Sequence, residues 1–328
     1  MIKFLSCFLI IICINTLTGC TANRSYMFMK MQHGPVNMTL VNITKNDYNI
    51  FDSQGNPADL PDIINAAGFV DTVFIGESHG DPCAHFLELN ILENLYKCYQ
   101  KENKGSIIIS MEMFERDVQP VIDEYMKDLI TEKHFLSASR PWPGYMKNYR
   151  AIVEFAKKNN IPLIAANAPS RYVNRVSRLG KEALNDLSEN AKNRWLPPLP
   201  YEQASEKYRK KFKKFWENIP AHNNMNKNPE NNKAFQNFID AQSLWDASMA
   251  FSIKNKLEHK HNRLVINING IFHSSQGLGV PEHLLKYMPK INILTISIIS
   301  GKNFPNFDNQ YKDYGDFIIF TNPELQEQ

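Results

Sequence analysis

Short, almost wholly apolar runs alternate along the chain with longer segments in which apolar residues recur every three or four positions. The longer segments, such as 84–101, 118–130 and 146–159, have the spacing of amphipathic helices. Buried strands separated by helices are typical of parallel sheets covered on both faces. The pattern therefore predicts an α/β fold, a mainly parallel sheet flanked by helices on both faces. The predicted strands are 71–76, 106–113, 162–167, 263–269, 291–300 and 317–321.

Two regions depart from this alternation. Near the N-terminus, 38–43 and 48–51 predict a hairpin around Lys45-Asn46-Asp47. Further on, 177–236 has no strand pattern and predicts a small all-helical insertion. Its segment 201–216 predicts a helix with a basic face, which could bind an anion or an acidic lipid but is most simply a solvated surface. The predicted organisation is a signal peptide (1–19), a tether with the hairpin (20–55), the first part of the α/β domain (56–176), the helical insertion (177–236) and the second part of the α/β domain (237–328).

The N-terminus has the pattern of a secretory signal. Residues 4–17 are almost entirely apolar, but the run is shorter than the ~20 residues that a membrane-spanning helix needs. The run ends in Leu17-Thr18-Gly19-Cys20, which matches a bacterial lipobox. We expect cleavage before Cys20, a lipid on its thiol, an acyl chain such as palmitate on the new amine, and a durable membrane anchor. Because residue 21 is Thr rather than Asp, the outer membrane is the expected location.

Composition excludes several classes of protein. The chain has 328 residues, a formal net charge of +3, 43% hydrophobic residues and five cysteines. This balance excludes a disordered chain and a strongly basic nucleic-acid-binding tail, so no nucleic-acid partner is expected. The cysteines are too few and too unevenly spaced for a disulfide framework.

Polar side chains that carry chemistry follow the predicted strands. Glu77 and His79 follow the first strand, Glu112 lies at the end of the second, Asn167 ends the third, and His273 comes shortly after the fourth. Ligands of open α/β sheets bind at the carboxyl ends of the strands, so these side chains should converge on one rim. A carboxylate in an apolar strand needs a partner, which makes His79 or His273 the expected partner of Glu112. Asp246, within a predicted helix, is a further candidate for this cluster.

The sequence resembles the ChaN-like haem-binding lipoproteins, within a wider group that includes the erythromycin esterases and the Tiki and TraB proteins. The resemblance runs from about residue 60 to 285, and the lipobox fits it. It implies an α/β sandwich with a helical subdomain, haem binding and a role in bacterial iron uptake. The motifs that carry it are Phe74–His79 with His85, Met111–Arg116, Trp142 and Tyr149 before Phe155–Lys157, Ile164–Arg171, Asp246–Ala250, and Gly270–His273 with Gly279–Pro281.

Haem is accordingly the expected cofactor, and a non-covalent one because the chain has no Cys-x-x-Cys-His motif. Haem iron accepts His or Tyr as an axial ligand. Tyr172 is the first candidate for the iron ligand, since Arg171 and Arg175 beside it could hold the propionates. Tyr145, Tyr149, His85 and Tyr201 are further candidates. The haem is expected on the side of the insertion, because the rim cluster is too polar to form the whole of such a pocket.

Two other functions stay open at this point. The rim cluster of Glu77, His79, Glu112, Asn167, Asp246 and His273 could make the protein a hydrolase, either with a divalent metal or by acid and base catalysis. The chain has no His-Glu-x-x-His helix, and enzymatic activity is uncertain and less favoured than haem binding. It could also be an envelope lipoprotein with a vestigial site. Expected partners are haem, the membrane, an outer-membrane haem receptor and a second copy of the chain.

Overall fold

A computed structural model describes residues 43–217, 232–258 and 263–325. These residues form one sheet of eight strands, in the order β2-β1-β8-β7-β3-β6-β4-β5. The strands from β8 to β5 in this order are parallel, and β1 is antiparallel to both β8 and β2. Their bounds are β1 (Tyr48–Asp52), β2 (Pro57–Ala58), β3 (Thr72–Glu77), β4 (Ser106–Glu115), β5 (Leu163–Asn167), β6 (Arg263–Gly270), β7 (Ile293–Ser300) and β8 (Phe317–Thr321).

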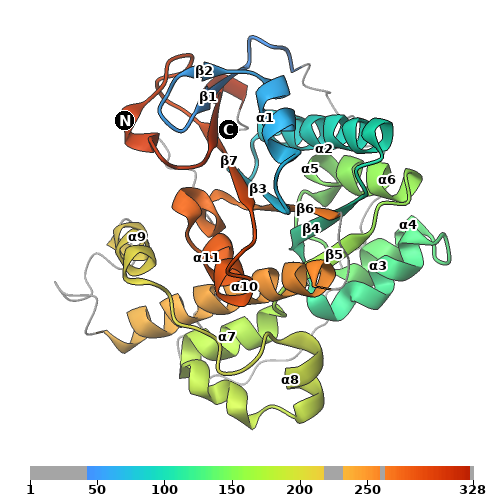
Figure 1. Ribbon diagram of the computed structural model, residues 1–328. Helices are drawn as coiled ribbons and strands as arrows, with labels where there is room; N and C mark the ends of the chain where they lie inside the picture. The colour runs from blue at the N-terminus through green and yellow to red at the C-terminus, as the bar shows by residue number, and fades with distance from the viewer. Residues whose placement is uncertain (1–42, 218–231, 259–262, 326–328) are drawn as a thin grey trace, which may run out of the picture. The chain divides into compact units, whose positions relative to one another are not determined.

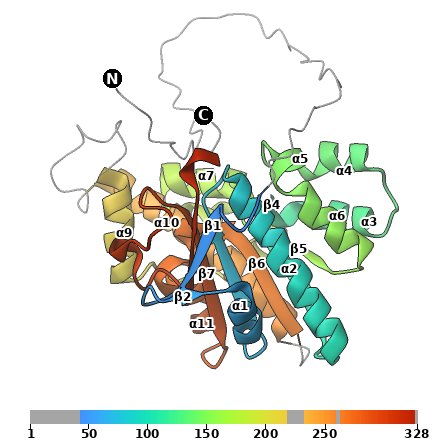
Figure 2. The same ribbon diagram turned by 90° about the horizontal axis from the view of Figure 1, so that it is seen from above.

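Helices cover both faces of this sheet (Figure 1; Figure 2). Alternate residues of each strand point to opposite faces, and so those of the central strands β3, β4 and β6 separate into two apolar clusters. One cluster joins Val73 and Ile75 of β3 to α1, α2, α3 and α6, and the other joins Phe74 to α10 and α11. The helices are α1 (Leu60–Ala67), α2 (Pro82–Glu102), α3 (Gln119–Met126), α4 (Glu132–Ser139), α5 (Tyr145–Asn148), α6 (Arg150–Lys158), α7 (Ser170–Leu179), α8 (Glu189–Trp195), α9 (Glu206–Glu217), α10 (Lys233–Leu257) and α11 (Val280–Tyr287).

The predicted α/β fold is confirmed, since the sheet is mainly parallel and every residue of β3 is buried. Local details differ from the prediction. The helix predicted at 146–159 is interrupted at Tyr149 and becomes α5 and α6. The helix predicted from 201 begins only at Glu206, where the Ser205 hydroxyl accepts a hydrogen bond from the backbone N–H of Tyr208 and caps the helix. Most of the predicted strand 38–43 lies outside the described residues, and Ile43 is not in a strand; β1 pairs with β8 and β2.

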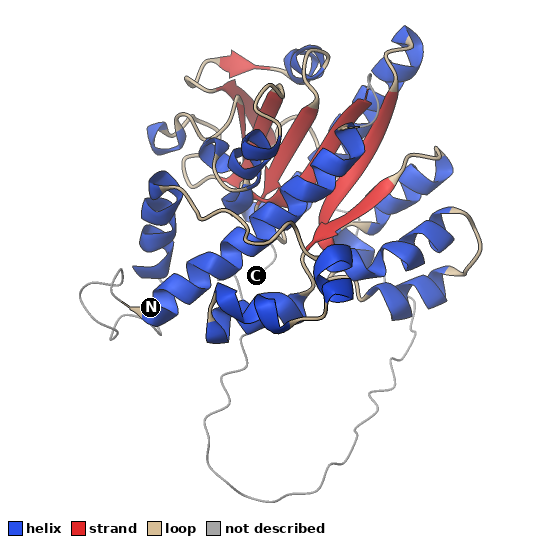
Figure 3. Ribbon diagram, turned by 60° about the horizontal axis from the view of Figure 1, so that its bottom comes forward, coloured by secondary structure: helices blue, strands red, loops and turns tan. Residues whose placement is uncertain are grey.

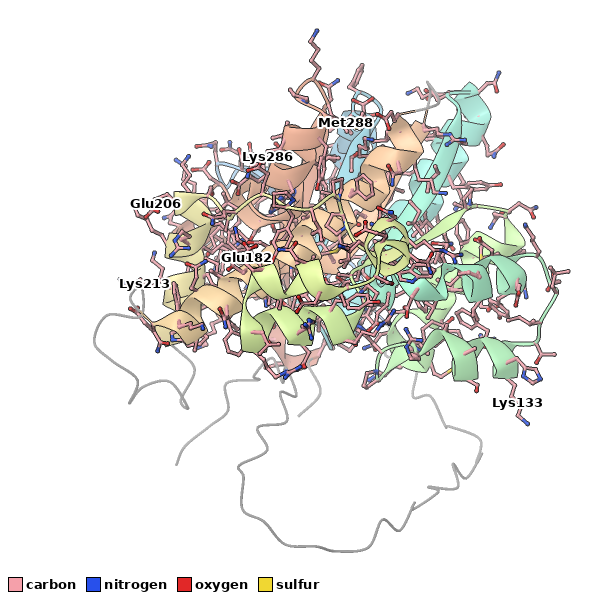
Figure 4. All side chains as sticks on the ribbon, turned by 90° about the horizontal axis from the view of Figure 1, so that it is seen from below. Lys133, Glu182, Glu206, Lys213, Lys286 and Met288 are labelled. Atoms are coloured by element: carbon pink, nitrogen blue, oxygen red, sulfur yellow. The ribbon has the colours of Figure 1, made fainter. Side chains whose placement is uncertain are left out.

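Within the described residues the chain between β5 and β6 is helical, through α7, α8, α9 and α10 (Figure 3). The long helix α10 lies across the strands and gives α7 and α9 a surface to pack on. Figure 4 looks onto this side of the molecule, with Glu206 and Lys213 labelled on α9. The predicted domain boundaries stay a prediction. Among the described helices, none combines the length and the apolarity needed to cross a membrane.

Candidate functional site

The carboxyl ends of three neighbouring strands bring the candidate residues together. Glu77 is the last residue of β3, and its register partner in β6 is Gly270. On the other side of β6, the side chain of Glu112 in β4 accepts a hydrogen bond of 2.7 Å from the backbone N–H of Gly270. Because β6 lies between β3 and β4, the two carboxylates flank the same short stretch of backbone. This is the convergence that strand order predicts at such a sheet edge.

A first group of side chains surrounds Glu77. Its Oε1 accepts a 2.6 Å hydrogen bond from the Tyr149 hydroxyl and lies 2.7 Å from His79 Nδ1. Its Oε2 lies 3.0 Å from the Nδ1 of His85, which is also 3.1 Å from Glu88 Oε2. The rings of His85 and Tyr149 pack edge to face, and His79 meets Trp142 in the same way. The side chains of Glu77 and Glu88 are fully buried, whereas that of His79 is 23% exposed.

A second group surrounds His273. Its Nδ1 lies 2.6 Å from Asp246 Oδ1, and its Nε2 faces Glu112 Oε1 at 3.5 Å. Helix α10 supplies Asp246, so the helix on one face of the sheet orients an imidazole at its edge. The loop that carries His273 is held by Lys211 of α9, whose ammonium donates to the backbone oxygens of Phe272 and Ser275.

The two groups meet at Gly270. A Cβ atom at this position would lie only 2.7 Å from His79 Nε2 and 3.7 Å from Glu112 Oε2. Any side chain there would displace the imidazole, so the glycine is required by close approach rather than by backbone conformation. The residues around Glu77 and those around His273 therefore form one network.

Burial and charge set the protonation of this network. Burial alone would raise the pKa of the Glu77 carboxyl, but His85 and His79 hold it below its usual range. Burial opposes the charge on His85 as well, yet Glu77 and Glu88 raise its pKa to about 10. Glu88 is the opposite case: burial and the neighbouring Glu77 raise its pKa to about 8. One carboxylate of this pair is ionised beside an imidazolium, while the other keeps its proton at neutral pH.

Comparison with known proteins identifies the family. The family model described as "Haem-binding uptake, Tiki superfamily, ChaN" matches residues 63–284, more than half of the chain. The chain belongs to this family. A search of the curated proteins finds no match.

One solved structure shows the same fold. The chain is similar to a structure of ChaN of Campylobacter jejuni with cofacially bound haem, with 18% identity and a TM-score of 0.63 over 85% of this chain and 98% of that one. A more distant match is the type III effector HopBA1, with 12% identity and a TM-score of 0.43 over 80% of this chain and 94% of that one. Another is a variant of the erythromycin esterase EreC in its open conformation, with 10% identity and a TM-score of 0.41 over 86% and 83%.

In this member of the ChaN family, most of the residues proposed for the rim cluster lie together. Glu77, His79, Glu112, Asp246 and His273 all belong to the network, and His273 is the imidazole beside Glu112. Asn167 is buried, but its side chain accepts from the backbone N–H of Ala168 within its own turn. It has the role of a turn former.

The candidates for haem ligation lie in several places. Tyr201 is buried, and its hydroxyl donates to the backbone oxygen of Asp240. Tyr149 and His85 belong to the network around Glu77. Tyr145 is buried among the rings of Phe114 and Phe135. The remaining candidates are on α7, where Tyr172 is half-buried beside Arg171, and Arg175 is tied to Asp186 and to the backbone oxygen of Ala183.

Three members of the network were missed by the sequence analysis. Glu88 lies three residues after His85 on α2, a spacing that places both on one helix face and could have revealed it. Tyr208 and Lys211 of α9 could not be distinguished from a solvated basic helix. Burial lowers the pKa of Lys211 to about 8, and burial beside Asp246 raises the pKa of Tyr208.

The network predicts a loss of stability at alkaline pH. Burial opposes protonation of His273, but Glu112 and Asp246 raise its pKa to about 9 from an ordinary value of 6.5. The stabilisation of the folded state by the protonated His273 is therefore complete below pH 6.5, and it is lost as the pH rises through about 9. We expect His273 to contribute about 3 kcal/mol to the fall in the free energy of unfolding over this window. Urea unfolding at several pH values measures it.

The contribution of His273 is the difference between wild type and His273→Gln. The variant should show a shallower fall between pH 6.5 and 9, whereas the exposed His134→Gln should follow the wild type. Parallel curves for wild type and His273→Gln would contradict the assignment.

Proposed function

We propose that this chain is a lipid-anchored protein of the bacterial cell envelope that binds haem non-covalently for iron uptake. Membership of the haem-binding uptake family, over residues 63–284, is the observation that carries the proposal. The proposed location is the outer membrane, with an outer-membrane haem receptor as the partner. The ChaN protein of Campylobacter jejuni binds haem cofacially. A homodimer that places two haems face to face is proposed for this chain as well.

The proposed iron ligand is Tyr172. A porphyrin approaches its ligand face on, so the ligand atom must be accessible. Tyr149 and His85 are buried and committed to Glu77, and the Tyr145 ring is enclosed by other aromatic rings. Tyr172 is half-buried on α7, and its hydroxyl lies 3.4 Å from the guanidinium of Arg171. The residues on α7 therefore fit a haem.

The charged groups beside Tyr172 suit the propionates of a haem. The Arg171 guanidinium lies over the Tyr172 ring, 4.5 Å from its centre, and its side chain is 47% exposed. Arg171 also forms an ion pair with Asp117. A guanidinium has five N–H groups, so others remain available to a propionate. We assign a haem propionate to Arg171, because guanidinium and carboxylate groups match in geometry. Arg175 is the weaker candidate, since Asp186 and Ala183 already occupy its guanidinium.

Ferric haem titrated into the full chain in detergent tests the proposal. The wild type should give a high-spin ferric spectrum, and Tyr172→Phe should shift the Soret band and weaken binding by roughly tenfold or more. The matched control is Tyr96→Phe, a half-buried tyrosine on α2, which should bind as the wild type does. The double variant Glu77→Ala, His79→Ala should keep most of the affinity. If the double variant loses haem while Tyr172→Phe keeps its spectrum, haem binds at the rim and this placement is wrong.

The lipid anchor is tested separately. In bacteria fed labelled palmitate, the wild type should take up label and lose residues 1–19, because a thiol at position 20 is the proposed acceptor. Cys20→Ala should accumulate as an unlabelled precursor. Cys13→Ala, which changes a cysteine inside the apolar run, should be processed and labelled normally. Label in the Cys20→Ala protein would refute the anchor.

A hydrolase is the second candidate function, and the Asp246–His273 pair is the observation that favours it. A carboxylate 2.6 Å from Nδ1 fixes the orientation of an imidazole, as general acid–base catalysis requires. Against it, His273 and Glu112 are both nearly fully buried, so a substrate reaches them only if side chains move. Haem binding is therefore the better-supported function.

A further inference from the structure

The second turn of α2 faces the end of β3 with two polar side chains in an otherwise apolar interior. His85 and Glu88 lie on one face of α2, next to the apolar Ala84 and Leu87. Both approach Glu77, and the carboxylates of Glu77 and Glu88 are fully buried. Two carboxyl groups so deep in a core need opposite charge or hydrogen-bond donors beside them, since burying an unpaired ion costs several kcal/mol.

The hydrogen bonds within the described residues do not satisfy this group. His85 Nδ1 is 3.0 Å from Glu77 Oε2 and 3.1 Å from Glu88 Oε2, but a single N–H cannot serve both carboxylates. Glu77 Oε2 and Glu88 Oε1 are not reached by solvent, and the proton that Glu88 keeps is the donor left for them among the described residues. His85 Nε2 is also buried without a hydrogen-bond partner among these residues. Buried polar atoms without partners are rare and point to a missing ligand.

The spacing of the three donor atoms matches a single metal ion. One donor atom from each of Glu77, His85 and Glu88 lies within 4.8 Å of the other two. Two ligands held ~2.1 Å from one tetrahedral ion lie about 3.4 Å apart, so His85 Nδ1, at 3.0 and 3.1 Å from the two carboxylates, needs to move only slightly to admit an ion. We propose that Glu77, His85 and Glu88 bind one divalent cation of the zinc or manganese class.

The charge and the donor types of the group define this class of ion. Without a metal the group is neutral overall, with an ionised Glu77, a protonated Glu88 and an imidazolium at His85. A divalent cation would displace the proton of Glu88 and one proton of His85, and it would balance the two negative charges that the carboxylates then carry. Imidazole nitrogen with carboxylate oxygen suits Zn²⁺ and Mn²⁺, whereas Ca²⁺ and Mg²⁺ prefer oxygen ligands alone. Zn²⁺ should bind more tightly than Mn²⁺ at the same site.

Tyr149 already holds two of the proposed ligands in place. The Tyr149 hydroxyl donates to Glu77 Oε1, which leaves Oε2 to face His85 and the proposed ion. The Tyr149 ring packs edge-on against His85, with ring centres 4.9 Å apart, and so fixes the imidazole plane. Such outer contacts orient metal ligands and tune their affinity. This site is separate from Tyr172 on α7 and goes beyond the proposed haem function.

The experiment uses the full chain in detergent, free of haem and stripped with a chelator. Zn²⁺ alone, and Mn²⁺ alone, are titrated by calorimetry, and metal retained after buffer exchange is counted by elemental analysis. The wild type should bind one equivalent, with Zn²⁺ tighter, and should melt at a higher temperature with Zn²⁺ present. Glu88→Gln should weaken binding at least tenfold and lose the rise in melting temperature. The control Glu93→Gln, at a partly exposed position on the same helix, should behave as the wild type.

The outcomes separate this site from the haem site. If Glu88→Gln does not fold, His85→Asn takes its place, and the wild-type stoichiometry stands as a test by itself. A wild type that retains no metal overturns the proposal, and so does equal binding by wild type and the folded variant. The haem titration of the metal-free chain is a separate measurement, so failure of one site is distinguishable from failure of the other.

Discussion

The edge of the sheet depends on the neutralisation of buried carboxylates. Glu77, Glu112 and Asp246 are all nearly inaccessible to solvent, and each lies beside an imidazole. The free energy needed to bury an unpaired carboxylate is larger than the stabilisation from a single hydrogen bond. Removal of one imidazole would therefore leave a charge that the surrounding core cannot solvate. The positions of β3, β4 and α10 relative to one another are therefore linked through ion pairs as well as through apolar packing.

Several parts of the fold serve this network from a distance. Gly270 leaves room for His79 between the two groups of side chains. Helix α10 carries Asp246 across the sheet to His273, and Lys211 of α9 holds the loop that follows β6. The helical segment between β5 and β6 thus contributes to the sheet edge through α9 and α10, in addition to presenting Tyr172 on α7.

The strand-end residues could be predicted from the sequence, because parallel strands align their carboxyl ends whatever the details of packing. Glu77, His79, Glu112 and His273 follow from that rule alone. Glu88 and Lys211 could not be placed, since a polar residue on a helix is as readily solvated as buried, and only tertiary packing decides. The sequence offers Tyr149 and His85 as haem ligands, which stays a prediction. It gives no sign of their contact with Glu77, which depends on the packing of α2 and on the break between α5 and α6.

The central claim is that the two groups of side chains act as one electrostatic unit. An NMR titration of the histidine imidazoles in wild type and Glu112→Gln tests it most directly. Glu112 raises the pKa of His273 and contributes to that of His79, although burial opposes both. Without its charge, the pKa of His273 should fall toward 6.5 and that of His79 should fall with it, while the control Glu93→Gln moves neither. If both imidazoles of Glu112→Gln titrate as they do in the wild type, the residues around Glu77 and those around His273 are independent sites and the account is wrong.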